Sequence, residues 1–158
     1  GYLIKFCIFS TNMAHFFENV ELRRKDGSKE MGGTALKGKV VGLYFSAHWC
    51  PPCRMFTPVL KDFYDEVCDD DFEIVFVSFD HKEEDQMQYI EEAHGDWLYV
   101  PFGDPSIQEA SNKLDVSGIP TLVIFNAKGE LVTKNGRSDV TTNTPKGSLN
   151  KWKSGNAA

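Results

Sequence analysis

Two continuous apolar stretches dominate the hydropathy pattern of the chain. Residues 39–46 include Val-Val-Gly-Leu-Tyr-Phe, and residues 72–79 read Phe-Glu-Ile-Val-Phe-Val-Ser-Phe. Strands that are buried on both faces lack the alternation of polar and apolar residues seen in half-exposed strands. The second stretch is also rich in the β-branched and aromatic residues that favour strands. Both stretches therefore predict central strands of a sheet.

Between these two strands, apolar residues recur at three- and four-residue spacing. They are Met55, Phe56, Val59, Leu60, Phe63 and Val67. This spacing predicts an amphipathic helix. Pro58 should kink the helix, because proline has no N–H for the helical hydrogen-bond ladder. The helix is expected to end at Cys68, before three consecutive aspartates, and Cys68 itself is interpreted as a bystander thiol.

Strand and helix patterns alternate along the rest of the chain. Residues 20–24 alternate weakly before an Asp-Gly-Ser turn, which predicts a short strand or hairpin. Residues 82–93 have helical composition, and a further helix is expected after Asp104, its predicted N-cap. A strand at 122–125 leads through a hairpin turn into residues 130–133. This alternation with short connections implies right-handed crossovers and a parallel core.

The N-terminal residues do not share this pattern. Residues 1–12 are apolar with one lysine, and Met13 resembles a natural start, so residues 1–13 are interpreted as a non-native or loose extension that carries Cys7. The alternative is a truncated signal peptide, although Lys5 interrupts its apolar core and Ser-Thr-Asn is not an Ala-x-Ala cleavage site.

The C-terminal residues are polar. Residues 141–158 contain Trp152 as their only aromatic residue. We therefore predict a folded domain over residues 14–140, followed by a flexible tail over 141–158.

The candidate chemistry lies between the first central strand and the following helix, where residues 46–54 read Ser-Ala-His-Trp-Cys-Pro-Pro-Cys-Arg. A helix N-terminus carries partial positive charge, and a cysteine placed there is stabilised as the nucleophilic thiolate. With two residues between them, Cys50 can attack a substrate disulfide and Cys53 can then resolve the mixed disulfide. Pro51 and Pro52 suit the first helical turn, where a missing N–H costs little.

A single Cys-x-x-Cys can also be half of a zinc site. No second Cys-x-x-Cys or Cys/His pair at ligand spacing accompanies it, so we predict neither a metal nor an organic cofactor. A net charge of −6 argues against nucleic-acid binding. The 158 residues, 41% of them hydrophobic, suit one domain, and no apolar run is long enough to span a membrane. The scattered cysteines differ from a secreted disulfide framework, which favours a cytoplasmic protein, or a secreted one if residues 1–12 are a signal remnant.

The string from Tyr44 to Arg54, followed by Phe-Thr-Pro at 56–58, resembles the thioredoxin superfamily and, within it, the tryparedoxin and nucleoredoxin branch. Worm thioredoxins carry a similar Pro-Pro active site. The resemblance covers roughly residues 14–137. It implies an α/β, thioredoxin-like fold, with a central mixed β-sheet flanked by helices on both faces and an irregular insert at 97–102.

The same resemblance gives roles to residues around the cysteines. It implies that the Ile119–Pro120 peptide bond is cis and faces the cysteine pair, with neighbouring backbone that pairs with the substrate chain. Trp49 is expected to shield one side of the site. His48 is a candidate for tuning the chemistry as a base, since a histidine can titrate near neutral pH, but its place two residues before Cys50 favours a position at the surface or at the substrate rim. These residues are predicted to shape the site and bind substrate, rather than to react.

Four further residues are candidates for tuning the chemistry. Tyr44 stands where bacterial-type thioredoxins carry a buried aspartate, and tyrosine is a poor base. Asp80 matches an acidic position of tryparedoxins and would either take part in proton transfer or cap the next helix. Arg54 adds positive charge that favours thiolate. Arg137 matches a tryparedoxin arginine, but the residues after it depart from the tryparedoxin pattern, which argues against trypanothione binding.

Together these features predict a thiol–disulfide oxidoreductase that reduces protein disulfides as a monomer. Its expected partners are disulfide-containing proteins, with peroxiredoxin-type peroxidases among them, and a reductase or low-molecular-weight thiol as electron donor. Two alternatives stay open. One is a redox-regulated, nucleoredoxin-like binding module with little turnover. The other is an oxidative-folding isomerase, favoured only if residues 1–12 derive from a signal peptide.

Overall fold

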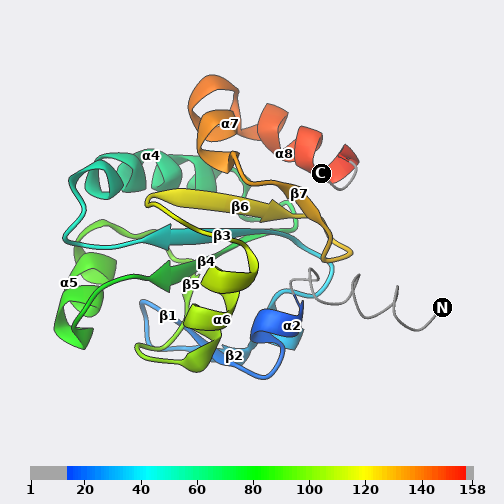
Figure 1. The fold of residues 1–158 in the computed structure, drawn as a ribbon. Coiled ribbons are helices and arrows are strands. Elements are labelled where there is room, and N and C mark those ends of the chain that lie inside the picture. Colours follow the sequence, from blue (N-terminus) through cyan, green and yellow to red (C-terminus); the bar gives the residue numbers. More distant parts are fainter. Residues whose placement is uncertain (1–13, 156–158) are drawn as a thin grey trace.

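The computed structural model describes residues 14–155 and contains one sheet (Figure 1). Its strands are β1 (Glu21–Arg24), β2 (Lys29–Met31), β3 (Val40–Ser46), β4 (Phe72–Ser78), β5 (Leu98–Tyr99), β6 (Thr121–Phe125) and β7 (Leu131–Thr133). The strand order is β2-β1-β5-β4-β3-β6-β7. β3 pairs in parallel with β4 and antiparallel with β6, so the sheet is mixed, as predicted.

Helices cover both faces of this sheet. They are α2 (Ala14–Phe17), α3 (Gly32–Ala35), α4 (Pro51–Val67), α5 (Glu83–Ala93), α6 (Pro105–Lys113), α7 (Gly136–Thr142) and α8 (Pro145–Ser154). One apolar core lies between the sheet and α4, α5, α7 and α8, and a second lies between the sheet and α2, α3 and α6 (Figure 1). None of the helices within residues 14–155 is long and apolar enough to cross a lipid bilayer.

The two central strands are buried along their whole length. Every residue of β3 and β4 is buried, which explains why their sequences are mainly apolar, with Glu73 as the one charged residue. Successive side chains of β3 point to opposite faces, so that Tyr44 joins the core beneath α4 whereas Leu43 and Phe45 join the other core. The strands thereby fix where the β3–α4 connection begins.

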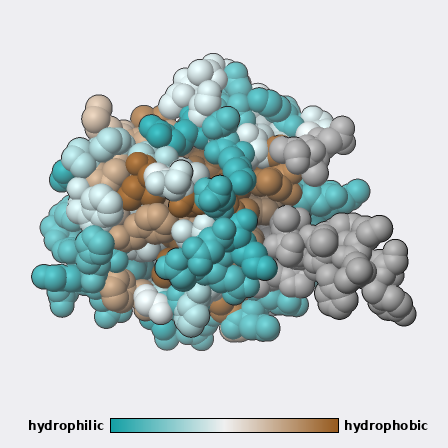
Figure 2. Space-filling view, viewed as in Figure 1, coloured by the Kyte–Doolittle hydropathy of each residue, from teal (hydrophilic) through white to brown (hydrophobic). Residues whose placement is uncertain are grey.

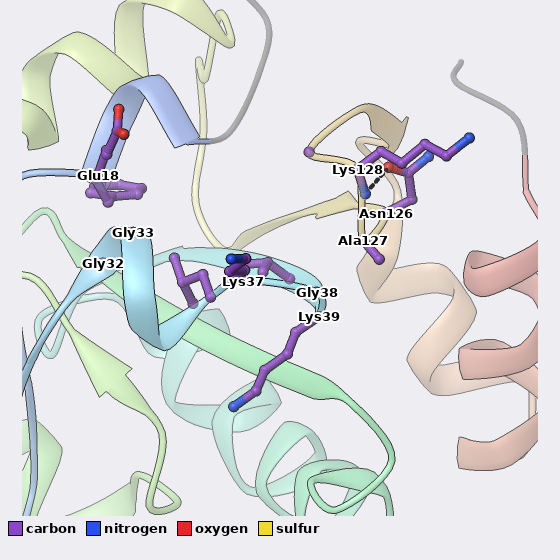
Figure 3. Close-up of a pocket in the computed structure, with 13 residues that line it drawn as sticks. Glu18, Gly32, Gly33, Lys37, Gly38, Lys39, Asn126, Ala127 and Lys128 are labelled. Carbon is purple, nitrogen blue, oxygen red and sulfur yellow. Dashed lines mark hydrogen bonds between the residues drawn. The ribbon is translucent and has the colours of Figure 1, made fainter.

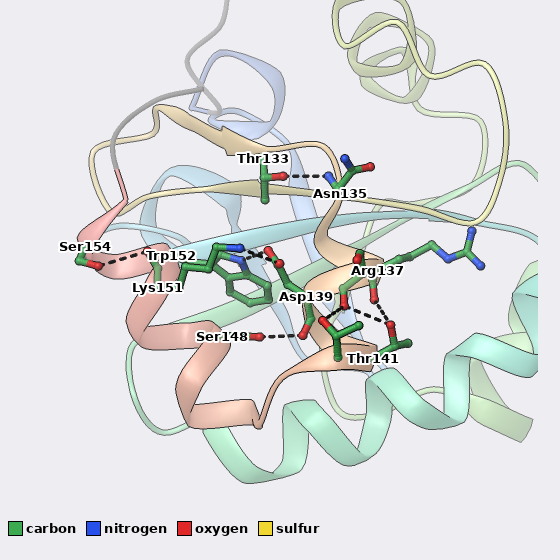
Figure 4. A network of polar contacts seen from close by, with 11 residues as sticks. Thr133, Asn135, Arg137, Asp139, Thr141, Ser148, Lys151, Trp152 and Ser154 are labelled. Carbon is green, nitrogen blue, oxygen red and sulfur yellow. Dashed lines mark hydrogen bonds and ion pairs between the residues drawn. The ribbon is translucent and has the colours of Figure 1, made fainter.

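The described residues 141–155 are not a flexible tail, so the prediction for this part of the chain is wrong, while residues 156–158 lie outside the described residues. Most of them form α8, in which Trp152 is fully buried and packs against Phe63 with ring centroids 5.5 Å apart. The indole Nε1 donates a hydrogen bond of 2.9 Å to Asp139 Oδ2 (Figure 4). Nζ of Lys151 contributes a second bond of 2.8 Å to the same carboxylate. Leu149 is buried in the same core, and Ser148 donates a 2.8 Å hydrogen bond to the carbonyl of Asp139, so apolar and polar contacts together dock this helix.

Two further predictions need correction. The segment 97–102 is not wholly irregular, because β5 within it pairs with both β4 and β1. On α4, Met55 and Val59 do not face the core and are 77% and 42% exposed. Figure 2 shows apolar surface at the end of the molecule where α4 begins, set among hydrophilic side chains. The predictions for residues 1–13 and Cys7 lie outside the described residues.

Candidate active site

The cysteine pair lies where β3 passes into α4, at the carboxyl ends of the two central parallel strands (Figure 1). Cys50 is the N-cap of α4 and Cys53 lies in its first turn. The two residues form a disulfide with Cα atoms 5.2 Å apart. Cys50 is 5% exposed and Cys53 is fully buried behind it. Only Cys50 is therefore within reach of an incoming substrate sulfur.

Both prolines lie exposed in the first turn of α4. Because Pro51 and Pro52 have no N–H, the first backbone donor of the helix is the amide of Cys53. That amide lies 3.3 Å from Cys50 Sγ, where it would stabilise negative charge on the sulfur. The two prolines thus leave one helix-terminal donor and direct it to the candidate nucleophile.

The Ile119–Pro120 loop faces the cysteine pair. Its peptide bond is cis, as predicted, and the carbonyl oxygen of Ile119 lies 3.8 Å from Cys50 Sγ. Arg137 donates from Nη1 to the carbonyl of Pro120 at 3.2 Å, and its guanidinium lies 5.5 Å from the centre of the Phe56 ring. Arg137 therefore lies near the site, as the resemblance implies, and its hydrogen bond holds the Ile119–Pro120 loop in place.

Trp49 forms one wall of the site. Its side chain is 51% exposed, and its Nε1 donates to the carbonyl of Phe79 at 3.1 Å. The indole stacks on the ring of His81 with centroids 5.6 Å apart and planes 7° from parallel. No sequence motif marks His81. Its signal in the sequence is its place three residues after the end of β4, beside the site.

Asp80 ties the active-site loop to the end of β4. Its buried carboxylate accepts 2.8 Å hydrogen bonds from the backbone N–H of His48 and the hydroxyl of Ser78. It does not cap α5, which begins at Glu83 after Lys82, so that alternative is wrong. Burial raises the pKa of Asp80 above its ordinary value, while the bonds from Ser78 and His48 oppose this rise.

The rings and charges next to this loop belong to the rim of the site. The imidazole of His48 lies 3.2 Å from Glu92 and packs against Tyr89 with centroids 5.6 Å apart. Hydrogen bonding by Gln88, then by His48, and the nearby charge of Arg54 lower the pKa of Glu92. Arg54 is exposed in the first turn of α4, where its charge adds to the positive helix end.

Comparison with known proteins identifies the family to which this disulfide site belongs. A family model described as thioredoxin-like matches residues 38–131. The chain belongs to the thioredoxin-like family. It is 41% identical over 122 residues to tryparedoxin of Trypanosoma brucei brucei, covering 75% of this chain and 82% of that protein. This match and the next place it in the tryparedoxin and nucleoredoxin-like branch of a family of thiol–disulfide oxidoreductases.

Nucleoredoxin of Danio rerio is 45% identical over 122 residues of this thioredoxin-like protein. The match covers 75% of this chain but 28% of that protein, so the chain spans about a quarter of the nucleoredoxin length. A crystal structure of thioredoxin from Wuchereria bancrofti superposes with a TM-score of 0.76 at 54% identity. The superposition covers 86% of this chain and 95% of that one.

The thioredoxin-like protein has a tyrosine, not a carboxylate, beneath its buried cysteine. Tyr44 is fully buried, and its hydroxyl lies 2.7 Å from Thr57 Oγ1 and 3.4 Å from the carbonyl oxygen of Cys53. Burial raises the pKa of Tyr44 far above its ordinary value. The phenol therefore stays protonated at neutral pH and cannot serve as a general base.

In the described part of the chain, neither metal-ligating side chains nor the thiol of Cys68 form a second site. Within residues 14–155, no group of three His, Cys, Asp or Glu side chains is placed to hold a metal ion. Cys68 follows the last turn of α4, about 25 Å from Cys50 by the rise of the helix. Burial, then the charges of Asp69 and Asp65, raise the pKa of this thiol and disfavour its thiolate.

A cavity of about 230 Å³ lies between α3 and the turn after β6 (Figure 3). Its lining comes from α2, α3, the residues before β3 and the turn after β6, including Phe17, Lys37 and Asn126. The cysteine pair follows the other end of β3. The cavity is therefore not part of the thiol site.

Proposed function

We propose that this protein is a protein-disulfide reductase that works through a Cys50–Cys53 dithiol/disulfide cycle. The proposal rests on one arrangement. Cys50 is the N-cap of α4, and its sulfur lies next to the amide of Cys53 and faces the cis-Pro120 loop. Cys53 is buried directly behind Cys50. This geometry separates an accessible nucleophile from a protected resolving thiol.

In the reduced protein, the Cys50 thiolate attacks one sulfur of a substrate disulfide. The substrate S–S bond breaks, a mixed disulfide forms, and the released substrate sulfur leaves as a thiolate that takes a proton. Cys53 loses its proton and attacks the sulfur of Cys50, which frees the second substrate thiol. The substrate gains two electrons and two protons, and the protein is left with the Cys50–Cys53 disulfide.

Substrate binding is assigned to the surface around Cys50. The exposed indole of Trp49 and the backbone beside Pro120 flank the sulfur, and the backbone there is proposed to pair with an extended segment of the substrate. Disulfide-containing proteins, peroxiredoxin-type peroxidases among them, are the proposed acceptors. A reductase or a low-molecular-weight thiol would return the two electrons.

The reduction potential of the Cys50–Cys53 couple tests the direction of the reaction. It is measured by equilibration in glutathione or dithiothreitol buffers. A potential below about −230 mV supports a reductant, because thioredoxin itself lies near −270 mV. A potential near −180 mV would overturn the assignment and indicate an isomerase.

Turnover separates a reductase from a redox-regulated binding module, the function that the match to nucleoredoxin favours as an alternative. We expect the protein to reduce insulin disulfides with dithiothreitol as donor. Cys53→Ser is expected to accumulate a mixed disulfide with the substrate, and Cys50→Ser to form none. A reversible couple without turnover would indicate the binding module.

A further inference from the structure

A chain of four buried hydroxyl groups lies beneath the first turn of α4, and the reaction cycle above does not use it. Its members are Tyr44, Ser46, Thr57 and Tyr89, each with no exposed surface. Thr57 Oγ1 is the junction. It lies 2.8 Å from the carbonyl oxygen of Cys53 and 2.7 Å from the Tyr44 hydroxyl, and it contacts the Tyr89 hydroxyl. Tyr89 in turn lies 2.7 Å from Ser46 Oγ.

One hydrogen bond in this chain has a fixed direction. A carbonyl oxygen only accepts, so Thr57 donates its single proton to Cys53. The Tyr44 hydroxyl lies 3.4 Å from the same carbonyl oxygen and can donate to it or to Thr57. Tyr89 and Ser46 extend the chain behind Thr57. The hydroxyl chain is therefore anchored at the carbonyl oxygen of Cys53.

The hydroxyl chain is not a proton acceptor for Cys53. A neutral hydroxyl is too weak a base to take the proton of the Cys53 thiol. Burial also keeps the phenol of Tyr44 neutral. What remains is a fixed set of donors that holds the carbonyl of Cys53, at the point where α4 begins.

The held carbonyl belongs to the residue whose amide faces the nucleophile. Cys53 N–H lies 3.3 Å from Cys50 Sγ, and the next amide, of Arg54, donates to the carbonyl of Cys50 at 3.1 Å. We propose that Thr57, supported by Ser46 and Tyr89, is a positioning residue that keeps the Cys53 amide directed at the Cys50 sulfur. The inference rests on the proposed function, in which Cys50 reacts as a thiolate.

The test is the pH dependence of Cys50 alkylation by iodoacetamide in the reduced protein, with Thr57→Val compared against Thr57→Ser. Valine keeps the volume but removes the hydroxyl, whereas serine retains it. We expect the midpoint of the rate–pH curve to rise by about one unit in Thr57→Val, because the thiolate loses its fixed donor. Alkylation below the midpoint then slows about tenfold. Thr57→Ser is expected to keep the wild-type curve.

Tyr89→Phe provides a second variant that removes one hydroxyl and leaves the ring in place. It should shift the rate–pH curve of Cys50 alkylation in the same direction by a smaller amount. If Thr57→Val does not fold, Tyr89→Phe becomes the deciding test of the proposal. Urea unfolding of each variant reports stability separately. Lower stability with an unchanged alkylation curve in the folded variants would overturn the proposal. Failure of the wild-type protein to reduce insulin would reject the proposed function but leave the alkylation comparison valid.

Discussion

Lowering the pH from 7 to 5 is expected to destabilise the folded protein through one buried imidazole. His94 is 1% exposed, and its ring centroid lies 4.4 Å from those of Phe76 and Tyr89. Its Nδ1 accepts a hydrogen bond from Trp97 Nε1 at 3.2 Å, so this nitrogen is unprotonated, while its Nε2 has no hydrogen-bond partner. Burial, then the charge of Lys25, lower the pKa of His94 to about 3.

The size of the effect follows from proton linkage. The unfolded chain takes up a proton at this residue as the pH falls through 6.5, whereas the folded protein does so only near pH 3. The contribution of neutral His94 to stability is therefore fully present above pH 6.5 and is lost progressively below it. Between pH 7 and pH 5 the loss amounts to about 2 kcal/mol of the free energy of unfolding.

Urea unfolding at pH 7, 6 and 5 measures this loss directly. His94→Gln removes the titrating group while keeping a side-chain acceptor for Trp97, and it should show a pH dependence smaller by about 2 kcal/mol. Parallel curves for the wild type and His94→Gln between pH 7 and pH 5 would refute the reasoning.

Two further predictions concern stability away from the cysteines. Trp152→Ala should lower the free energy of unfolding by about 4 kcal/mol, because it removes a buried ring and leaves Asp139 without its indole donor. Urea unfolding measures this loss, and a loss below about 1 kcal/mol would show that α8 is not docked. Glu73→Gln should cost about 2 kcal/mol, since it removes the charge that faces Arg24 at 2.9 Å. Lys61→Ala, at an exposed ion pair, is its control and should change stability by less than about 0.5 kcal/mol.

The central strands and the site motif were predictable because their signals are local and strong. The strands expected at 39–46 and 72–79 are observed at Val40–Ser46 and Phe72–Ser78. Each is an apolar run that only a doubly covered strand can bury. The helix between them begins at the Cys-Pro-Pro-Cys turn, where the prolines and the N-cap position coincide.

Elements that depend on long-range contacts were missed. β5 has two residues. It forms because its backbone pairs with both β4 and β1, and no side-chain pattern in the sequence predicts this pairing. α8 has few large apolar residues, so its periodicity is weak. It docks because Trp152 and Leu149 are buried in the core and Trp152 donates to Asp139, contacts that form only once the helix packs on the rest of the domain.

Asp80 shows why a site residue can be found in the sequence while its role cannot. Its acidity and position were visible, but capping and proton transfer were equally consistent with them. The register of the sheet decides its contact: Ser46 lies opposite Ser78, so His48 and Asp80 each stand two residues beyond a paired position on neighbouring strands. The carboxylate therefore reaches the backbone of the active-site loop, 32 residues away in sequence. This explains why Asp80 holds the loop that carries Cys50, and why only the paired strands, not the local sequence, could specify that contact.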